Sequence, residues 1–194
     1  MNDAVSKSVK PSDCVLAFGI PTTRDDFERA VKEPKNREFV VNCCPSWEEY
    51  EFEVVSEIDK TVPNIERLGV RVVRNLTLSM FGQLFEEQST RVIVLFCHGD
   101  TSNLEFDDGL ATGDQVVEQI PKDSTMTIDL CACSAFGPAK AIIKQRPSCL
   151  TKFVEVSATP SYWLYFYWAL FKMLSDKNLD YTEALAETVD LFVE

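Results

Sequence analysis

The chain has 194 residues, of which 45% are hydrophobic and 26% are charged, so we expect one globular domain, residues 1–194, with a packed core. The formal net charge of −12 argues against partners such as nucleic acid or anionic lipid, because these polyanions require a basic surface. Residues 1–12 are expected to form a flexible N-terminus without signal-peptide features, and the longest apolar run, 162–174, is too short to span a membrane. We therefore expect a cytoplasmic protein.

Short apolar runs alternate along the chain with longer stretches of helical periodicity. This alternation predicts an α/β fold, a three-layer α/β/α sandwich around a mostly parallel central sheet. The expected strands are Cys14–Ile20, Phe39–Cys44, Val70–Asn75, Val92–Cys97, Met126–Cys131 and Phe153–Val156.

Helices are expected between and after these strands. Thr23 and Ser46, each followed three residues later by an acidic residue, form capping boxes that begin two of them. The expected helices are Thr23–Lys32, Ser46–Asp59, Thr77–Gln88, Gly113–Gln119, Phe136–Lys144, Ser161–Leu174 and Tyr181–Val193. The aromatic-rich Ser161–Leu174 helix is apolar on nearly every face, so burial between the sheet and another helix is expected, with a partner-binding surface as the alternative.

The seven cysteines form an odd set, and five of them lie in or beside apolar runs, as reduced thiols do in a cytosolic core. A zinc site is not expected. The Cys131-x-Cys133 pair lacks the two-residue spacer of common zinc knuckles, and the chain has a single histidine. We expect neither a metal nor any other cofactor.

His98, the only histidine, follows the apolar run Val92–Cys97 and precedes Gly99. Open α/β sheets place their ligand sites outside the carboxyl ends of the strands, so His98 is expected where chemistry is done. Cys97 alternates to the opposite face of its strand and is expected in the core.

The strand Met126–Cys131 continues into Ala132, Cys133 and Ser134 and then a helix. If this strand neighbours the one before His98, a thiol and an imidazole meet at one edge of the sheet, which is sufficient for acyl transfer. Residues two apart in a strand face the same side, so periodicity leaves either Cys131 or Cys133 as the nucleophile.

An apolar strand that ends in His-Gly, followed by one that ends in Ala-Cys, resembles the caspase-like cysteine peptidases, and in particular the bacterial CHAT domains. The intervening segment 104–118, with Asp-Gly-Leu followed by a short helix, and the helical tail 166–187 are similar to the corresponding CHAT segments. The resemblance covers 92–193. Ser134 and Ala135 depart from it, because CHAT domains often have an acidic or amide residue and then Thr after the nucleophile.

The resemblance implies a cysteine endopeptidase with a Cys-His dyad that cleaves a protein substrate. By position it makes Cys133 the nucleophile, His98 the general base and Gly99 part of the oxyanion hole. It also implies a role in bacterial defence or programmed death, with activation by a protein partner. The alternative is a catalytically inactive CHAT-like module that binds a protein through its former substrate groove.

Caspase-like enzymes bind the first substrate residue in a pocket near the nucleophile, and an acidic pocket would select Arg or Lys. The candidates for such a pocket are Asp107, Asp108 and Asp129. Asp129 could equally be buried with a hydrogen-bond partner, and Asp107, Asp108 and Gly109 could simply form a turn.

Overall fold

The computed structural model describes residues 8–33, 44–153 and 158–193. Its centre is a sheet of five parallel strands in the order β2-β1-β3-β6-β7. β1 and β3 are buried along their whole length, as expected for strands covered on both faces, which read as continuous apolar runs. The strands are β1 Cys14–Phe18, β2 Arg71–Val73, β3 Val92–Phe96, β6 Thr127–Cys131 and β7 Leu150–Phe153.

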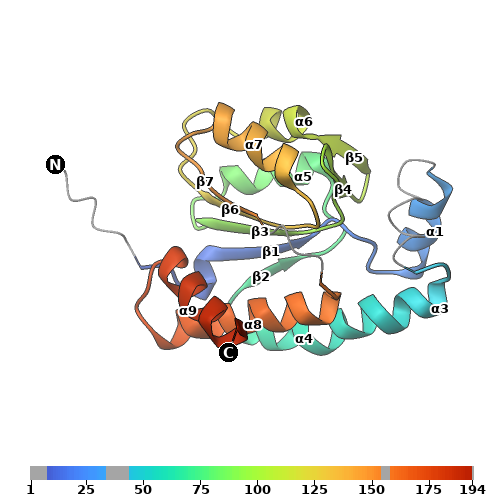
Figure 1. The fold of residues 1–194 in the computed structure, drawn as a ribbon, viewed down its shortest axis with the longest axis horizontal. Helices are drawn as coiled ribbons and strands as arrows, with labels where there is room; N and C mark the ends of the chain where they lie inside the picture. The colour runs from blue at the N-terminus through green and yellow to red at the C-terminus, as the bar shows by residue number, and fades with distance from the viewer. Residues whose placement is uncertain (1–7, 34–43, 154–157, 194) are drawn as a thin grey trace.

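Helices cover both faces of this sheet, which confirms the predicted three-layer α/β/α sandwich (Figure 1). The upper layer in Figure 1 holds α5 Leu78–Gln83, α6 Gly113–Glu118 and α7 Phe136–Gln145, and the lower layer holds α4 Ser56–Arg67, α8 Pro160–Asp176 and α9 Tyr181–Val193. Two further helices, α1 Arg24–Lys32 and α3 Trp47–Tyr50, lie at one end of the sheet, and a 3-10 turn, η3 Leu84–Glu86, follows α5.

Local capping chemistry begins several helices where the sequence predicts. The Thr23 side chain accepts a hydrogen bond from the N–H of Asp26, and Ser46 does the same for Glu49. The helix expected to end at Asp59 is longer than predicted. It passes through the π-helical segment η2 Glu51–Val55 into α4 and includes Pro63. Ile58, Val62 and Ile65 are all buried, so a continuous apolar face offsets the backbone bond that proline removes.

The last strand also differs from its prediction. β7 begins at Leu150, three residues before the expected start at Phe153, and positions 154–156 of the prediction lie outside the described residues. β7 is an edge strand with partly exposed side chains, so it lacks the apolar run that marks a central strand. Of the strand expected at Phe39–Cys44, only Cys44 lies within the described residues.

A small antiparallel hairpin, β4 Asn103–Phe106 and β5 Gly109–Thr112, crosses the carboxyl edge of the sheet. The N–H of Glu105 donates to the carbonyl of His98 after β3, and the N–H of Asp107 donates to the carbonyl of Leu76 after β2. An added Cβ on Gly19, just after β1, would lie 2.4 Å from the Glu105 carbonyl oxygen. The hairpin therefore packs directly on the backbone where three strands end.

Part of the N-terminus also packs against the domain. Val9 is buried, and its N–H donates to the carbonyl of Leu179 at 3.0 Å. The carbonyl of Ser8 accepts from the Arg91 guanidinium, and Pro11–Asp13 form a 3-10 turn, η1. Of the N-terminus expected to be flexible, residues 8–12 are therefore held against the sheet and α8–α9 connection.

Candidate active site

His98 and Cys133 leave the sheet from neighbouring strands at its carboxyl edge. β3 and β6 are parallel partners in which Phe96 lies opposite Cys131, and the N–H of Cys97 donates to the carbonyl of Cys131 at 3.2 Å. His98 and Cys133 each lie two residues beyond this last registered pair. The two strands are therefore neighbours, which is the condition under which the sequence predicts that a thiol and an imidazole meet at this edge.

Gly99 lies against the segment that contains Cys133. A Cβ added to Gly99 would be 3.1 Å from the Cys133 carbonyl oxygen and 3.2 Å from the Ala132 Cβ. On its other side Gly99 forms an antiparallel bridge with Leu104 of the hairpin. These contacts leave little room for a side chain at position 99, so the His98-Gly99 backbone stays close to the backbone of Cys133.

His98 is only partly buried as a residue, but its Nε2 atom has less than 1 Å² of accessible surface. Burial lowers the pKa of this imidazole from its ordinary value of 6.5 to about 4, because a desolvated ring disfavours the charged form. The ring is therefore neutral near pH 7, which leaves one nitrogen able to accept a proton.

Burial separates the two candidate nucleophiles. Cys131 is 3% exposed, and burial raises the pKa of its thiol well above the usual range, with a further rise from the nearby Asp129 carboxyl. Cys133 is partly exposed at the bend after β6. Since the thiolate is the reactive species and a substrate has to reach it, Cys133 is the better placed of the two. Cys97 is buried, as the sequence predicts.

The bend after Cys133 has a strained backbone. Ser134 has a φ of 56°, in the left-handed region that non-glycine residues rarely adopt. Its carbonyl accepts a 2.7 Å hydrogen bond from the N–H of Phe136, the first residue of α7. This sharp turn holds Cys133 between the end of β6 and the N-terminus of α7.

The three carboxylates considered for a substrate pocket all have partners within the chain. Asp107 accepts a 2.6 Å hydrogen bond from Arg29, and Asp108 accepts from the backbone N–H of Leu78. Asp107 and Asp108 form the turn of the hairpin, which matches the turn that the sequence offered as the alternative.

Asp129 is 2% exposed and lies in the middle of β6, four residues and therefore about 13 Å of extended chain before Cys133. Its carboxylate accepts hydrogen bonds from the hydroxyls of Tyr167 and Tyr181. It is thus buried with hydrogen-bond partners, the alternative considered from the sequence, and the structure does not bring it together with His98.

Glu105 is an acidic residue of this region that sequence reasoning missed. It is 1% exposed, burial raises the pKa of its carboxyl from 4.5 to about 8, and no described residue donates a hydrogen bond to its Oε2 atom. In the sequence it alternates with Leu104 and Phe106, a pattern typical of a strand with one exposed face. Only the packing of β4 across the sheet edge buries its second face.

The fold and this site define an α/β domain with a parallel sheet and a thiol and an imidazole at adjacent strand ends. No protein-family model matches the chain, and no curated protein is similar to it. In the described ranges, no three His, Cys, Asp or Glu side chains are grouped as metal ligands, and no helix is both long enough and apolar enough to cross a bilayer.

Proposed function

We propose that this chain is a cysteine endopeptidase that cleaves a protein substrate with Cys133 as nucleophile and His98 as general base. The observation that supports this most directly is the register of β3 and β6, from which both residues emerge side by side. Cys133 is partly exposed, so a substrate can reach it, and the ring of His98 is neutral, so it can accept a proton.

The chemistry needs only these two side chains and backbone N–H groups. As the Cys133 sulfur attacks the substrate carbonyl carbon, the thiol proton passes to His98, and the oxyanion accepts hydrogen bonds from the N–H groups of Gly99 and Cys133. The imidazolium then protonates the leaving amine, and a thioester remains on Cys133. Water attacks this thioester with His98 as base, which releases the acid product and the free thiol. No metal or other cofactor takes part.

The low pKa of His98 affects the first step. An imidazole whose pKa is about 4 is neutral in the resting enzyme, and we propose that it accepts the thiol proton as the carbon–sulfur bond forms. Binding of a substrate or a protein partner that relieves the desolvation of His98 would raise its pKa and make it a stronger base. Activation by a protein partner and a role in a defence or programmed-death system follow from the resemblance to CHAT domains, and we include both in the proposal, with the cytoplasm as the expected location.

Labelling with peptide electrophiles tests the proposal. The purified protein is treated with a mixed library of peptidyl acyloxymethyl ketones, and the modified residue is identified by mass spectrometry for wild type, Cys133→Ala, Cys131→Ala and His98→Ala. We expect labelling at Cys133, retained in Cys131→Ala and reduced at least about 1,000-fold in His98→Ala.

Cleavage of a mixed peptide library by the same four proteins then reports the preferred residue. Labelling of Cys133 at an equal rate in His98→Ala would refute the dyad, because the thiol would then be reacting without its base. Cleavage that persists in Cys133→Ala would refute the assignment of the nucleophile.

A further inference from the structure

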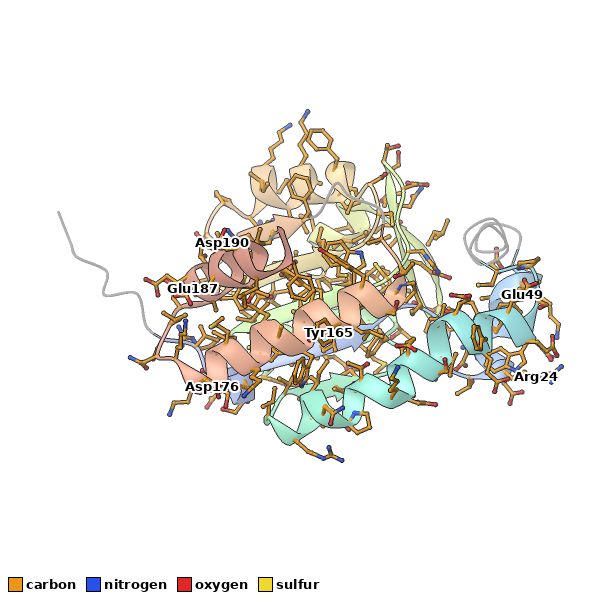
Figure 2. The ribbon with its side chains drawn as sticks, turned by 60° about the horizontal axis from the view of Figure 1, so that its bottom comes forward. Arg24, Glu49, Tyr165, Asp176, Glu187 and Asp190 are labelled. Atoms are coloured by element: carbon orange, nitrogen blue, oxygen red, sulfur yellow. The ribbon has the colours of Figure 1, made fainter. Side chains whose placement is uncertain are left out.

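A cavity lies away from the proposed dyad, between the edge strand β7 and helices α8 and α9. Its volume is about 570 Å³, within the range typical of small-molecule sites. Figure 2 views the α8 side of the molecule, with Tyr165 labelled on α8 and Glu187 and Asp190 on α9. The cavity walls are predominantly apolar, and they include Phe153, Trp163, Phe166, Leu185, Val189 and Phe192.

Aromatic side chains of α8 and α9 line this cavity and also contact one another. Phe192 of α9 contacts Tyr162 and Phe166 of α8, with ring centroids 5.5 and 5.2 Å apart, and Tyr162 also packs edge-on against Trp163. Such edge-to-face pairs fix the spacing of the two helices. Tyr162 and Val189, both about 40% exposed, line the cavity, so an apolar surface leads from solvent into the space.

Two charged side chains of the sheet also line the cavity, and they differ in what they offer a ligand. Asp129 already accepts the hydroxyls of Tyr167 and Tyr181, one on each carboxylate oxygen. Lys152 is the Cα partner of Asp129 on β7. Burial raises the pKa of the Asp129 carboxyl and the Lys152 charge acts in the opposite direction, but within the described residues the ammonium forms no hydrogen bond and no ion pair within 4 Å. The cavity thus contains an acid whose two oxygens both have donors and a nearby cation that attracts this acid without a hydrogen bond to it.

From these contacts we propose that the cavity binds a small apolar molecule with a single acid group. The apolar body lies among the aromatic rings of α8 and α9, and the acid group accepts hydrogen bonds from the Lys152 ammonium. An amine ligand fits worse, because Lys152 repels it and both oxygens of Asp129 already have donors. Binding here is independent of the proposed peptidase reaction.

Two fluorescent probes with nearly the same aromatic body test this proposal: 1-anilinonaphthalene-8-sulfonate carries the acid group, and N-phenyl-1-naphthylamine lacks it. We expect the 194-residue chain to bind one equivalent of the sulfonate. Lys152→Met should weaken sulfonate binding at least tenfold and change binding of the neutral probe less than twofold. The matched control is Lys172→Met, because Lys172 is paired with Asp176 on α8 and does not line the cavity.

Two variants that fill the cavity complete the test. Val189→Trp and Ala158→Phe place bulk at two different wall positions, and each should abolish binding of both probes while the cooperative thermal transition is kept. The proposal is overturned if neither probe binds, if both folded wall variants still bind, or if Lys152→Met leaves the sulfonate affinity unchanged. Equal loss of both probes in Lys152→Met would likewise rule out recognition of the acid group.

Discussion

Gly137→Ala tests the packing between α7 and the loop after His98, because helix propensity and packing predict stability changes of opposite sign. Gly137 is the second residue of α7, and by helix propensity alone alanine would stabilise the protein by up to about 1 kcal/mol. In the structure, however, the new Cβ would lie 2.0 Å from the Thr101 carbonyl oxygen, where real Cβ contacts do not fall below 3.0 Å. The backbone has to move by about 1 Å, the difference between these two distances.

The loop does not move easily, because the Asp100 carboxylate accepts 2.6 Å hydrogen bonds from the N–H groups of both Ser102 and Asn103. Overpacking against such a backbone costs about 3 kcal/mol. After the propensity gain, the net loss is about 2 kcal/mol, which lowers the Tm by roughly 4–8 °C in a domain of this size.

Differential scanning calorimetry of Gly137→Ala and a control, Gly82→Ala, measures this effect. A Cβ on Gly82, in α5, would approach the flexible end of the Gln119 side chain at 2.9 Å, so we expect an unchanged or slightly higher Tm there. A higher Tm in Gly137→Ala would refute the packing described between α7 and the loop. A fall of similar size in both variants would show that the loss has another origin.

Three further predictions concern titration and buried hydrogen bonds. Burial raises the pKa of Glu105 from 4.5 to about 8. The protonated carboxyl therefore stabilises the folded state fully below pH 4.5, and this stabilisation is lost as the pH rises through 8. In urea denaturation, Glu105→Gln should therefore raise the free energy of unfolding above that of wild type by about 4 kcal/mol at pH 8 and about 1 kcal/mol at pH 5. An equal increase at both pH values would contradict the burial argument. Tyr181→Phe leaves an oxygen of the buried Asp129 without its donor and should lower the free energy of unfolding by about 1–3 kcal/mol in the same assay. Its control is Tyr165→Phe, at a side chain that is 57% exposed, which should change the free energy of unfolding by less than about 0.5 kcal/mol. The acid limb of the pH profile for electrophile labelling should report a pKa near 4, the value for His98, and a midpoint near 6.5 would mean that the ring is solvated.

Much of the fold is predictable because its elements are marked locally. The central strands are apolar runs buried on both faces, and side chains such as Thr23 and Ser46 bond the first free N–H groups of their helices. The sequence misplaces elements where tertiary packing overrides the local pattern. The helix through Pro63 continues because its apolar face is buried, and β7 starts earlier than predicted because an edge strand needs no continuous apolar run.

The candidate site also has parts that local sequence patterns predict and parts that depend on tertiary packing. His98 and Cys133 are predictable because strand ends in a parallel sheet share an edge, and the register then supplies the pairing. The choice between Cys131 and Cys133 needs burial, which a two-residue period cannot provide. Glu105 and the partners of Asp129 depend on contacts between elements far apart in the sequence, so no local pattern reveals them.

The tight backbone contacts at the carboxyl edge suggest how this protein could be engineered or could diversify. Gly19 approaches the Glu105 carbonyl, Gly99 the Cys133 carbonyl and Gly137 the Thr101 carbonyl, so the packing around the candidate site depends on main-chain atoms, which are present whatever the side chains are. Sequence changes along this edge of the sheet should therefore spare these three glycines, because a side chain at any of them would meet backbone that surrounding substitutions leave in place.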